Sequence, residues 1–68
     1  MFVVTRTVTV TTQLLAHDIN AAHVLAAKTR ADISQAGARV EILAPDGAFI
    51  QGWCFDGQRW TAYVGAPP

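Results

Sequence analysis

Two turn signals divide the second half of this 68-residue chain into three short segments that favour strands. The first is the Pro-Asp-Gly sequence at residues 45–47, where proline presets its own φ and glycine accepts a positive φ. The second is the Asp-Gly pair at residues 56–57, which is typical of two-residue hairpin loops. These signals predict strands over residues 39–44, 48–55 and 59–64, joined as consecutive hairpins.

The first half of the chain is expected to supply one more strand and a helix. Residues 2–10 are rich in β-branched side chains, which suit a pleated strand. Residues 13–36 are rich in Ala, Leu, Lys and Gln, with Thr11 and Thr12 as N-cap candidates and Gly37 as the helix end. One apolar stripe of this helix contains Leu15, Ile19, Ala22, Ala26 and Ile33. The predicted fold class is α+β, in the order β-α-β-β-β, with one helix packed on a mainly antiparallel four-stranded sheet.

The length limits the chain to a single domain, which we place at residues 1–64 and follow with a frayed tail at residues 65–68. A domain this small usually needs an additional source of stability. Cys54 is alone and cannot form an internal disulfide, and the spacing of His17, His23 and Cys54 does not suit a metal site. We therefore expect extra burial from self-association or from a partner protein, and we expect no cofactor.

Charge and hydropathy point to a cytoplasmic protein that does not depend on nucleic-acid phosphates. Five basic residues balance five acidic ones, so the formal net charge is zero, whereas phosphate binding needs a basic surface. The N-terminal residues lack the basic start and long apolar run of a signal peptide. No stretch approaches 18 apolar residues, so no membrane span is expected.

The predicted turns also fix which side chains share a face of the sheet. A three-residue first loop pairs Ala44 with Ala48, Leu43 with Phe49 and Ile42 with Ile50, and a two-residue second loop pairs Phe55 with Gln58. Both resulting faces are largely apolar. The first carries Val40, Ile42, Ala44, Ile50, Cys54, Thr61 and Tyr63. The second carries Leu43, Phe49, Trp53, Phe55, Trp60, Ala62 and Val64, with Arg39, Glu41 and Gln51 among them.

A single helix can cover only one of these two faces, and an uncovered apolar face usually marks an interaction site. We expect the first face to pack on the helix and the face with Trp53 and Trp60 to meet another chain. The reverse assignment stays open, and a bulge at Gly52 would rotate Trp53 inward. An aromatic face near Arg39 or Arg59 could also stack single-stranded bases, although the basic residues are few and scattered.

No constellation of residues favours catalysis. His17 and His23 are six residues apart, so on a helix they do not converge on one ligand. Cys54 lies between two aromatic residues of a predicted strand, where a small core residue is expected. We therefore expect a protein that is not an enzyme.

Three segments of the second half form a recognisable series: Val40-Glu41-Ile42, the turn at residues 45–47, and the Asp-Gly-Gln-Arg-Trp sequence at residues 56–60. In these segments the chain resembles small phage anti-CRISPR proteins of the type I-F system. Members of that family have an Arg-Ile-Glu strand, an Asn-Gly turn, an aromatic strand and a final Asp-Gly-Lys-Arg-Trp hairpin, after an alanine-rich helix. This chain departs from the pattern at Gln58 and Cys54, where the family has lysine.

The resemblance implies an inhibitor that binds a type I CRISPR surveillance complex, a host ribonucleoprotein, and blocks target DNA. Arg59 matches the arginine of the family's hairpin, and Lys28 and Arg30 are approximate counterparts of its helix residues. Two alternatives stay open: a homo-oligomer, such as a homodimer, that associates through the aromatic face, and a single-stranded nucleic-acid binder. The candidate partner-binding residues are Arg59, Trp60, Trp53, Phe49, Lys28, Arg30 and Arg39.

Overall fold

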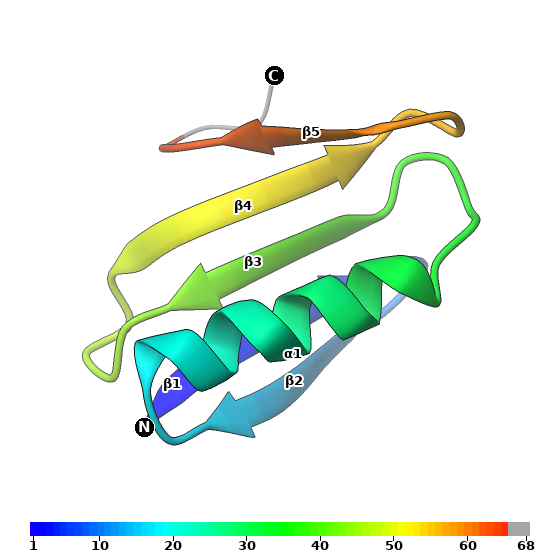
Figure 1. Cartoon of the computed structure of the whole chain (residues 1–68). Helices are drawn as coiled ribbons and strands as arrows, with labels where there is room; N and C mark the ends of the chain where they lie inside the picture. Colours follow the sequence, from blue (N-terminus) through cyan, green and yellow to red (C-terminus); the bar gives the residue numbers. More distant parts are fainter. Residues whose placement is uncertain (66–68) are drawn as a thin grey trace.

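Within the described part of the chain, the β-branched and apolar segments form five strands, and the alanine-rich segment forms one helix (Figure 1). The computed structural model describes residues 1–65, so most of the predicted tail at 65–68 lies outside the described residues. The elements, in chain order, are β1 (Phe2–Thr7), β2 (Thr11–Ala16), α1 (Ile19–Ala31), β3 (Arg39–Leu43), β4 (Phe49–Phe55) and β5 (Trp60–Tyr63). The α+β class is confirmed, and the sheet has five strands instead of the predicted four.

The additional strand is β2, which lies in the region predicted to begin the helix. It forms a hairpin with β1, in which Thr7 pairs with Thr11 and their hydroxyl oxygens lie 3.1 Å apart. The connecting residues 8–10 include no Gly, Pro, Asn or Asp, so the sequence carries no turn signal there. Leu14 and Leu15 favour a helix locally, but pairing with β1 overrides that preference.

The helix is therefore shorter than predicted at both ends. It begins after Asp18, whose carboxylate oxygen Oδ1 accepts a hydrogen bond of 2.7 Å from the backbone N–H of Ala21. Asp18 thus acts as the N-cap in place of Thr11 or Thr12. The helix ends at Ala31, with Asp32 as its C-cap, and not at Gly37. Gly37 does have a positive φ of 88°, but in the loop beyond the helix.

The strand order is β2-β1-β3-β4-β5, and every neighbouring pair is antiparallel. Because β2 and β3 both run opposite to β1, they are parallel to each other, and α1 connects them across β1. Ala22 and Ala26 of the helix are fully buried. Their small side chains let the helix backbone approach the sheet closely, over a core whose largest fully buried side chains are Ile42, Val4 and Val40.

The β3–β4 hairpin contains a bulge that changes which side chains share a face. The predicted loop is confirmed, since the backbone N–H of Ala44 donates to the carbonyl of Ala48 and Leu43 pairs with Phe49. Ile42, however, pairs with Gln51, which leaves Ile50 as an extra residue in β4. The predicted pairing of Ile42 with Ile50 is therefore wrong. The alternation of side chains changes phase at this point, so Phe49 and Trp53 lie on opposite faces.

The β4–β5 hairpin has a longer loop than the predicted two residues. Phe55 pairs with Trp60, so residues 56–59 form the loop and the predicted pairing of Phe55 with Gln58 is wrong. The carboxylate of Asp56 accepts hydrogen bonds from the backbone N–H groups of Gln58 and Arg59, at 2.8 and 2.9 Å. Gly57 has a φ of 102°, which only glycine adopts without strain.

Candidate interaction surface

The helix covers only one side of the sheet, and only part of that side. It packs over β1, β2 and β3 but leaves β4 and β5 beside it (Figure 1). Trp53 pairs with Val40, which is fully buried beneath the helix, so Trp53 lies on the helix side of the sheet. Phe55 follows on the same face and pairs with Trp60. We call Trp53, Phe55 and Trp60 the aromatic surface.

This placement corrects the predicted assignment of faces. The tryptophans do share a face, as predicted, but it is the face on which the helix packs and not the opposite one. Cys54, Thr61 and Tyr63, which were expected under the helix, lie on the opposite face. The bulge at Ile50 produces the rotation that had been considered for Gly52.

Trp53 is held against the helix by two side chains. The guanidinium carbon of Arg30 lies 4.0 Å from the centre of the indole ring, which is the geometry of a cation–π contact. The imidazole of His23 meets the same ring edge-on, with the ring centres 6.1 Å apart and the planes at 84°. Trp53 is only partly buried, so the contacts with Arg30 and His23 orient its ring while part of the ring stays exposed.

Phe55 and Trp60 form a second aromatic group beyond the helix. Their ring centres are 5.0 Å apart and the planes are inclined by 26°, an offset-stacked arrangement. Both side chains contact the core at one edge and are only partly buried. The aromatic surface is thus a platform of packed rings, because each ring contacts another aromatic or cationic group.

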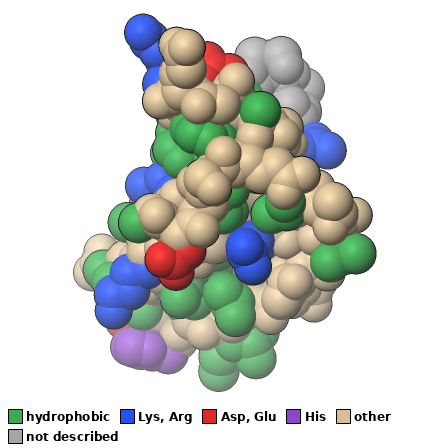
Figure 2. Space-filling view, turned by 90° about the vertical axis from the view of Figure 1, so that its right-hand side faces the viewer, with side chains coloured by type: hydrophobic (Ala, Val, Ile, Leu, Met, Phe, Trp, Pro, Cys, Tyr) green, Lys and Arg blue, Asp and Glu red, His purple; other side chains and the backbone are tan. Residues whose placement is uncertain are grey.

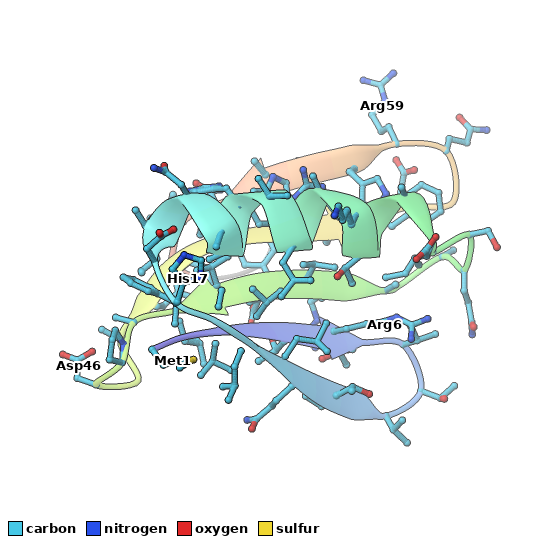
Figure 3. All side chains as sticks on the ribbon, turned by 60° about the horizontal axis from the view of Figure 1, so that its bottom comes forward. Met1, Arg6, His17, Asp46 and Arg59 are labelled. Atoms are coloured by element: carbon cyan, nitrogen blue, oxygen red, sulfur yellow. The ribbon has the colours of Figure 1, made fainter. Side chains whose placement is uncertain are left out.

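Two arginines give this platform a positive border. Burial lowers the pKa of Arg30 below its ordinary value of 12.5, and its buried Nη1 has no acceptor among residues 1–65. Arg59 is exposed in the β4–β5 loop, and its side chain extends away from the body of the protein (Figure 3). A carboxylate or phosphate on a partner would meet positive charge at Arg59 without displacing an internal ion pair, because no salt bridge of Arg59 occurs among the described residues.

The structure does not bring all the predicted site residues together. Arg59, Trp60, Trp53 and Arg30 lie on or beside the aromatic surface. Phe49 lies on the opposite face of the sheet, stacked on Tyr63 with ring centres 5.8 Å apart. Arg39 pairs with Cys54 and also lies on that opposite face. Lys28 lies on the exposed side of the helix, beside β2.

The opposite face has a feature that sequence reasoning missed. The hydroxyl of Tyr63 donates a hydrogen bond to the carboxylate oxygen Oε2 of Glu41, and the ring covers Gly52. Burial of the Tyr63 hydroxyl raises its pKa, and the neighbouring carboxylate of Glu41 raises it further. A glycine inside an apolar strand was the available signal, since such a glycine often marks a close approach.

The groups that could carry chemistry are dispersed. His17 Nε2 lies 3.0 Å from Asp18 Oδ2 at the exposed start of the helix. Cys54 is a half-buried free thiol. Among residues 1–65 no group of three or more His, Cys, Asp or Glu side chains is placed to hold a metal ion. In the same part of the chain, no helix has the length and apolarity needed to cross a membrane.

Basic residues do not gather into one patch on the side of the protein that Figure 2 shows. Lys and Arg side chains are separated there by apolar and neutral ones. This distribution suits local charge contacts with a protein better than continuous contact with a phosphate backbone. Comparisons with protein families, with curated proteins and with solved structures find no match for this chain.

Proposed function

We propose that this protein is a non-enzymatic binding protein that acts through its aromatic surface. The observation that carries the proposal is the partial cover of the sheet: α1 packs over three strands and leaves Trp53, Phe55 and Trp60 partly exposed beside it. An incompletely covered aromatic face is a typical protein-binding surface. Tryptophan and arginine are also the residue types that contribute most to protein interfaces.

The chemistry of the surface defines the kind of partner. Three ordered rings would bury apolar side chains of the partner, and Arg59 at the border would pair with an acidic group. Because the rings are already packed, binding would cost little side-chain entropy. A partner with an apolar patch edged by carboxylates fits these properties.

The resemblance to type I-F anti-CRISPR proteins makes a type I CRISPR surveillance complex the first partner to test. In this proposal the protein binds the complex and blocks access of target DNA. Arg59 occupies the position that the resemblance singles out, and its exposure in the β4–β5 loop supports a direct contact. Arg30 is engaged with Trp53 and would act by holding that ring in place.

Phage plating tests this function. In a host with active type I CRISPR immunity, expression of the protein should restore plating of targeted phage and leave untargeted phage unchanged. Arg59→Glu should abolish the effect without unfolding the protein, because Arg59 is exposed. Arg39→Glu is the matched control, since Arg39 is also exposed but lies on the opposite face. Unchanged plating with the wild-type protein would exclude that complex as its target.

A direct binding measurement separates the general proposal from this specific partner. Trp60→Ala should weaken binding to the purified complex at least as much as Arg59→Glu, and Arg39→Glu should leave it unchanged. Equal binding of all three variants would exclude the aromatic surface as the contact. Quenching of tryptophan fluorescence by single-stranded oligonucleotides would instead favour base stacking on the same rings.

A further inference from the structure

A second surface lies at the opposite end of the sheet from β5, where β2 is the edge strand. Among the described residues β2 pairs only with β1, so its outer backbone N–H and C=O groups have no strand beside them. Soluble proteins usually protect such an edge with charge, proline or a bulge. The β2 strand has none of these, since it is uncharged, lacks proline and pairs with β1 in continuous register over six residues.

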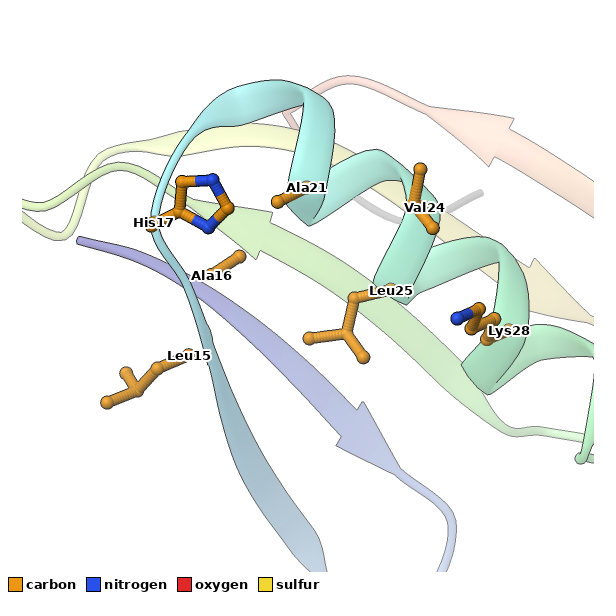
Figure 4. Close-up of a pocket in the computed structure, with 7 residues that line it drawn as sticks. All are labelled: Leu15, Ala16, His17, Ala21, Val24, Leu25 and Lys28. Carbon is orange, nitrogen blue, oxygen red and sulfur yellow. The ribbon is translucent and has the colours of Figure 1, made fainter.

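A groove of about 360 Å³ runs beside this edge, between β2 and α1 (Figure 4). Its lining is mainly apolar. Ala16 contributes from the strand, and Ala21 and Leu25 contribute from the helix. Val24 and Leu15 border the groove and are 56% and 65% exposed. Leu15 points away from the helix, so both sides of the edge strand offer apolar surface (Figure 4).

We propose that this edge is a homodimer interface, in which β2 pairs antiparallel with β2 of a second copy and the exposed sides of the two α1 helices face each other across the same two-fold axis. The groove, with the unpaired edge beside it, is then filled by the same residues of the other copy. This interface is separate from the aromatic surface and does not depend on the proposed function.

The dimensions of the two elements suit a two-fold axis. The six residues of β2 extend about 20 Å. The 13 residues of α1 also extend about 20 Å, and the helix runs back along the strand. A two-fold axis placed beside the middle of β2 is therefore also level with the middle of α1 along the strand direction. The two β2 strands then pair along their full length, and the helices, which lie over β1 and β3 as well as β2, face each other across the groove.

Charge complementarity favours a second copy over an unrelated strand. Lys28 lies at one end of the groove, and Asp18 lies beside His17 at the other end. The two-fold axis reverses the helix of the second copy, so Lys28 of each copy comes to the end that holds Asp18 of the other. The net charge of zero adds no long-range repulsion between copies.

The size of the surface predicts a reversible dimer. A two-layer edge about 20 Å long and about 20 Å thick gives a footprint of roughly 400 Å² per copy. Stable interfaces bury about 800 Å² per partner, so this dimer should dissociate on dilution. The full chain should be monomeric at low micromolar concentration and dimeric towards millimolar concentration.

Sedimentation over that concentration range is the test, with Leu15→Lys as the disrupting variant. A charge on the edge strand should raise the dimer dissociation constant about tenfold or more. Val64→Lys is the matched control, because Val64 is 76% exposed just after β5, at the other edge of the sheet, and should leave the constant unchanged. Val24→Lys places a charge on the helix side of the groove and should raise the dimer dissociation constant as well.

Hydrogen exchange identifies the strand that pairs. Backbone amides of β2 should exchange more slowly at high protein concentration, and those of β5 should not change. A wild-type chain that stays monomeric up to millimolar concentration would overturn the proposal. A dimer that survives both Leu15→Lys and Val24→Lys, with both variants folded, would overturn it too, as would concentration-dependent protection of β5 alone.

Discussion

The ring of Tyr63 in β5 lies directly over Gly52 in β4. The two residues pair across the strands, and a Cβ atom built on Gly52 would lie 2.5 Å from Cε2 and Cζ of the tyrosine ring. Any side chain at position 52 would therefore displace this ring. The ring cannot move freely, because its hydroxyl donates to Glu41 and its other neighbour is the stacked ring of Phe49.

Gly52→Ala should consequently destabilise the protein. Within a strand, alanine is normally more stable than glycine by about 0.5–1 kcal/mol. The overpacking against Tyr63 should cost about 1–3 kcal/mol, so the net change should be a loss of stability. Chemical denaturation gives the free energy of unfolding. In a Tyr63→Ala background the same substitution should be neutral or slightly stabilising. An equal loss in both backgrounds would show that the tyrosine ring is not the cause.

The titration of Tyr63 gives a second prediction. The pKa of Tyr63 is raised above its ordinary value of 10.0, mainly by burial and also by the hydrogen bond to Glu41. Below pH 10 the phenol is neutral in both the folded and the unfolded chain, so it adds no pH dependence. Above pH 10 the unfolded chain loses the proton first, so the free energy of unfolding should fall as the pH rises.

This titration can be read directly, because Tyr63 is the one tyrosine of the sequence. Phenolate absorbance should appear at higher pH in the native protein than in the denatured chain. Tyr63→Phe should abolish the absorbance change and flatten this part of the stability profile. Equal titration midpoints for native and denatured protein would contradict the burial of this hydroxyl.

Local signals predicted the parts of the fold that local chemistry determines. The Pro-Asp-Gly turn at residues 45–47 fixed the pairing of Leu43 with Phe49, because proline and glycine restrict the backbone within the turn itself. The apolar stripe through Ile19, Ala22 and Ala26 identified the helix face that packs on the sheet. These features depend on residues close together in the chain.

Features that depend on distant partners were missed. Strand β2 forms because β1 pairs with it. Neither its leucines nor the connection at residues 8–10 predicts a hairpin. The extra residue Ile50 is apolar like its neighbours, so alternation gave no sign of the bulge that separates Phe49 from Trp53. The contact between Arg30 and Trp53 depends on where the helix lies over the sheet, which periodicity does not specify.

The start of the helix provides a direct test of the corrected secondary structure. Asp18→Ala removes the acceptor for the backbone N–H of Ala21 and should lower the free energy of unfolding by about 1 kcal/mol. Thr12→Ala is the control, because Thr12 is an exposed residue of β2 and should cost less than about 0.5 kcal/mol. A larger loss for Thr12→Ala would favour the longer helix predicted from the sequence.

Acid should loosen the β4–β5 loop, and Asp56 is the group responsible. Its carboxylate accepts hydrogen bonds from the backbone N–H groups of Arg59 and Gln58, which hold the pKa of Asp56 below its ordinary value of 3.8. The ionised form is therefore favoured by the folded loop. Its contribution to stability is complete above pH 3.8 and is lost as the pH falls through the lower pKa of the folded state.

The amide chemical shifts of Gln58 and Arg59 report this protonation. Both should change together with one midpoint below 3.8, and Asp56→Asn should remove the transition because its side chain does not titrate. A midpoint at or above 3.8 would mean that the two backbone hydrogen bonds do not stabilise the carboxylate. The loop that presents Arg59 would then lack this support, and binding through Arg59 should show no loss on acidification through the same range.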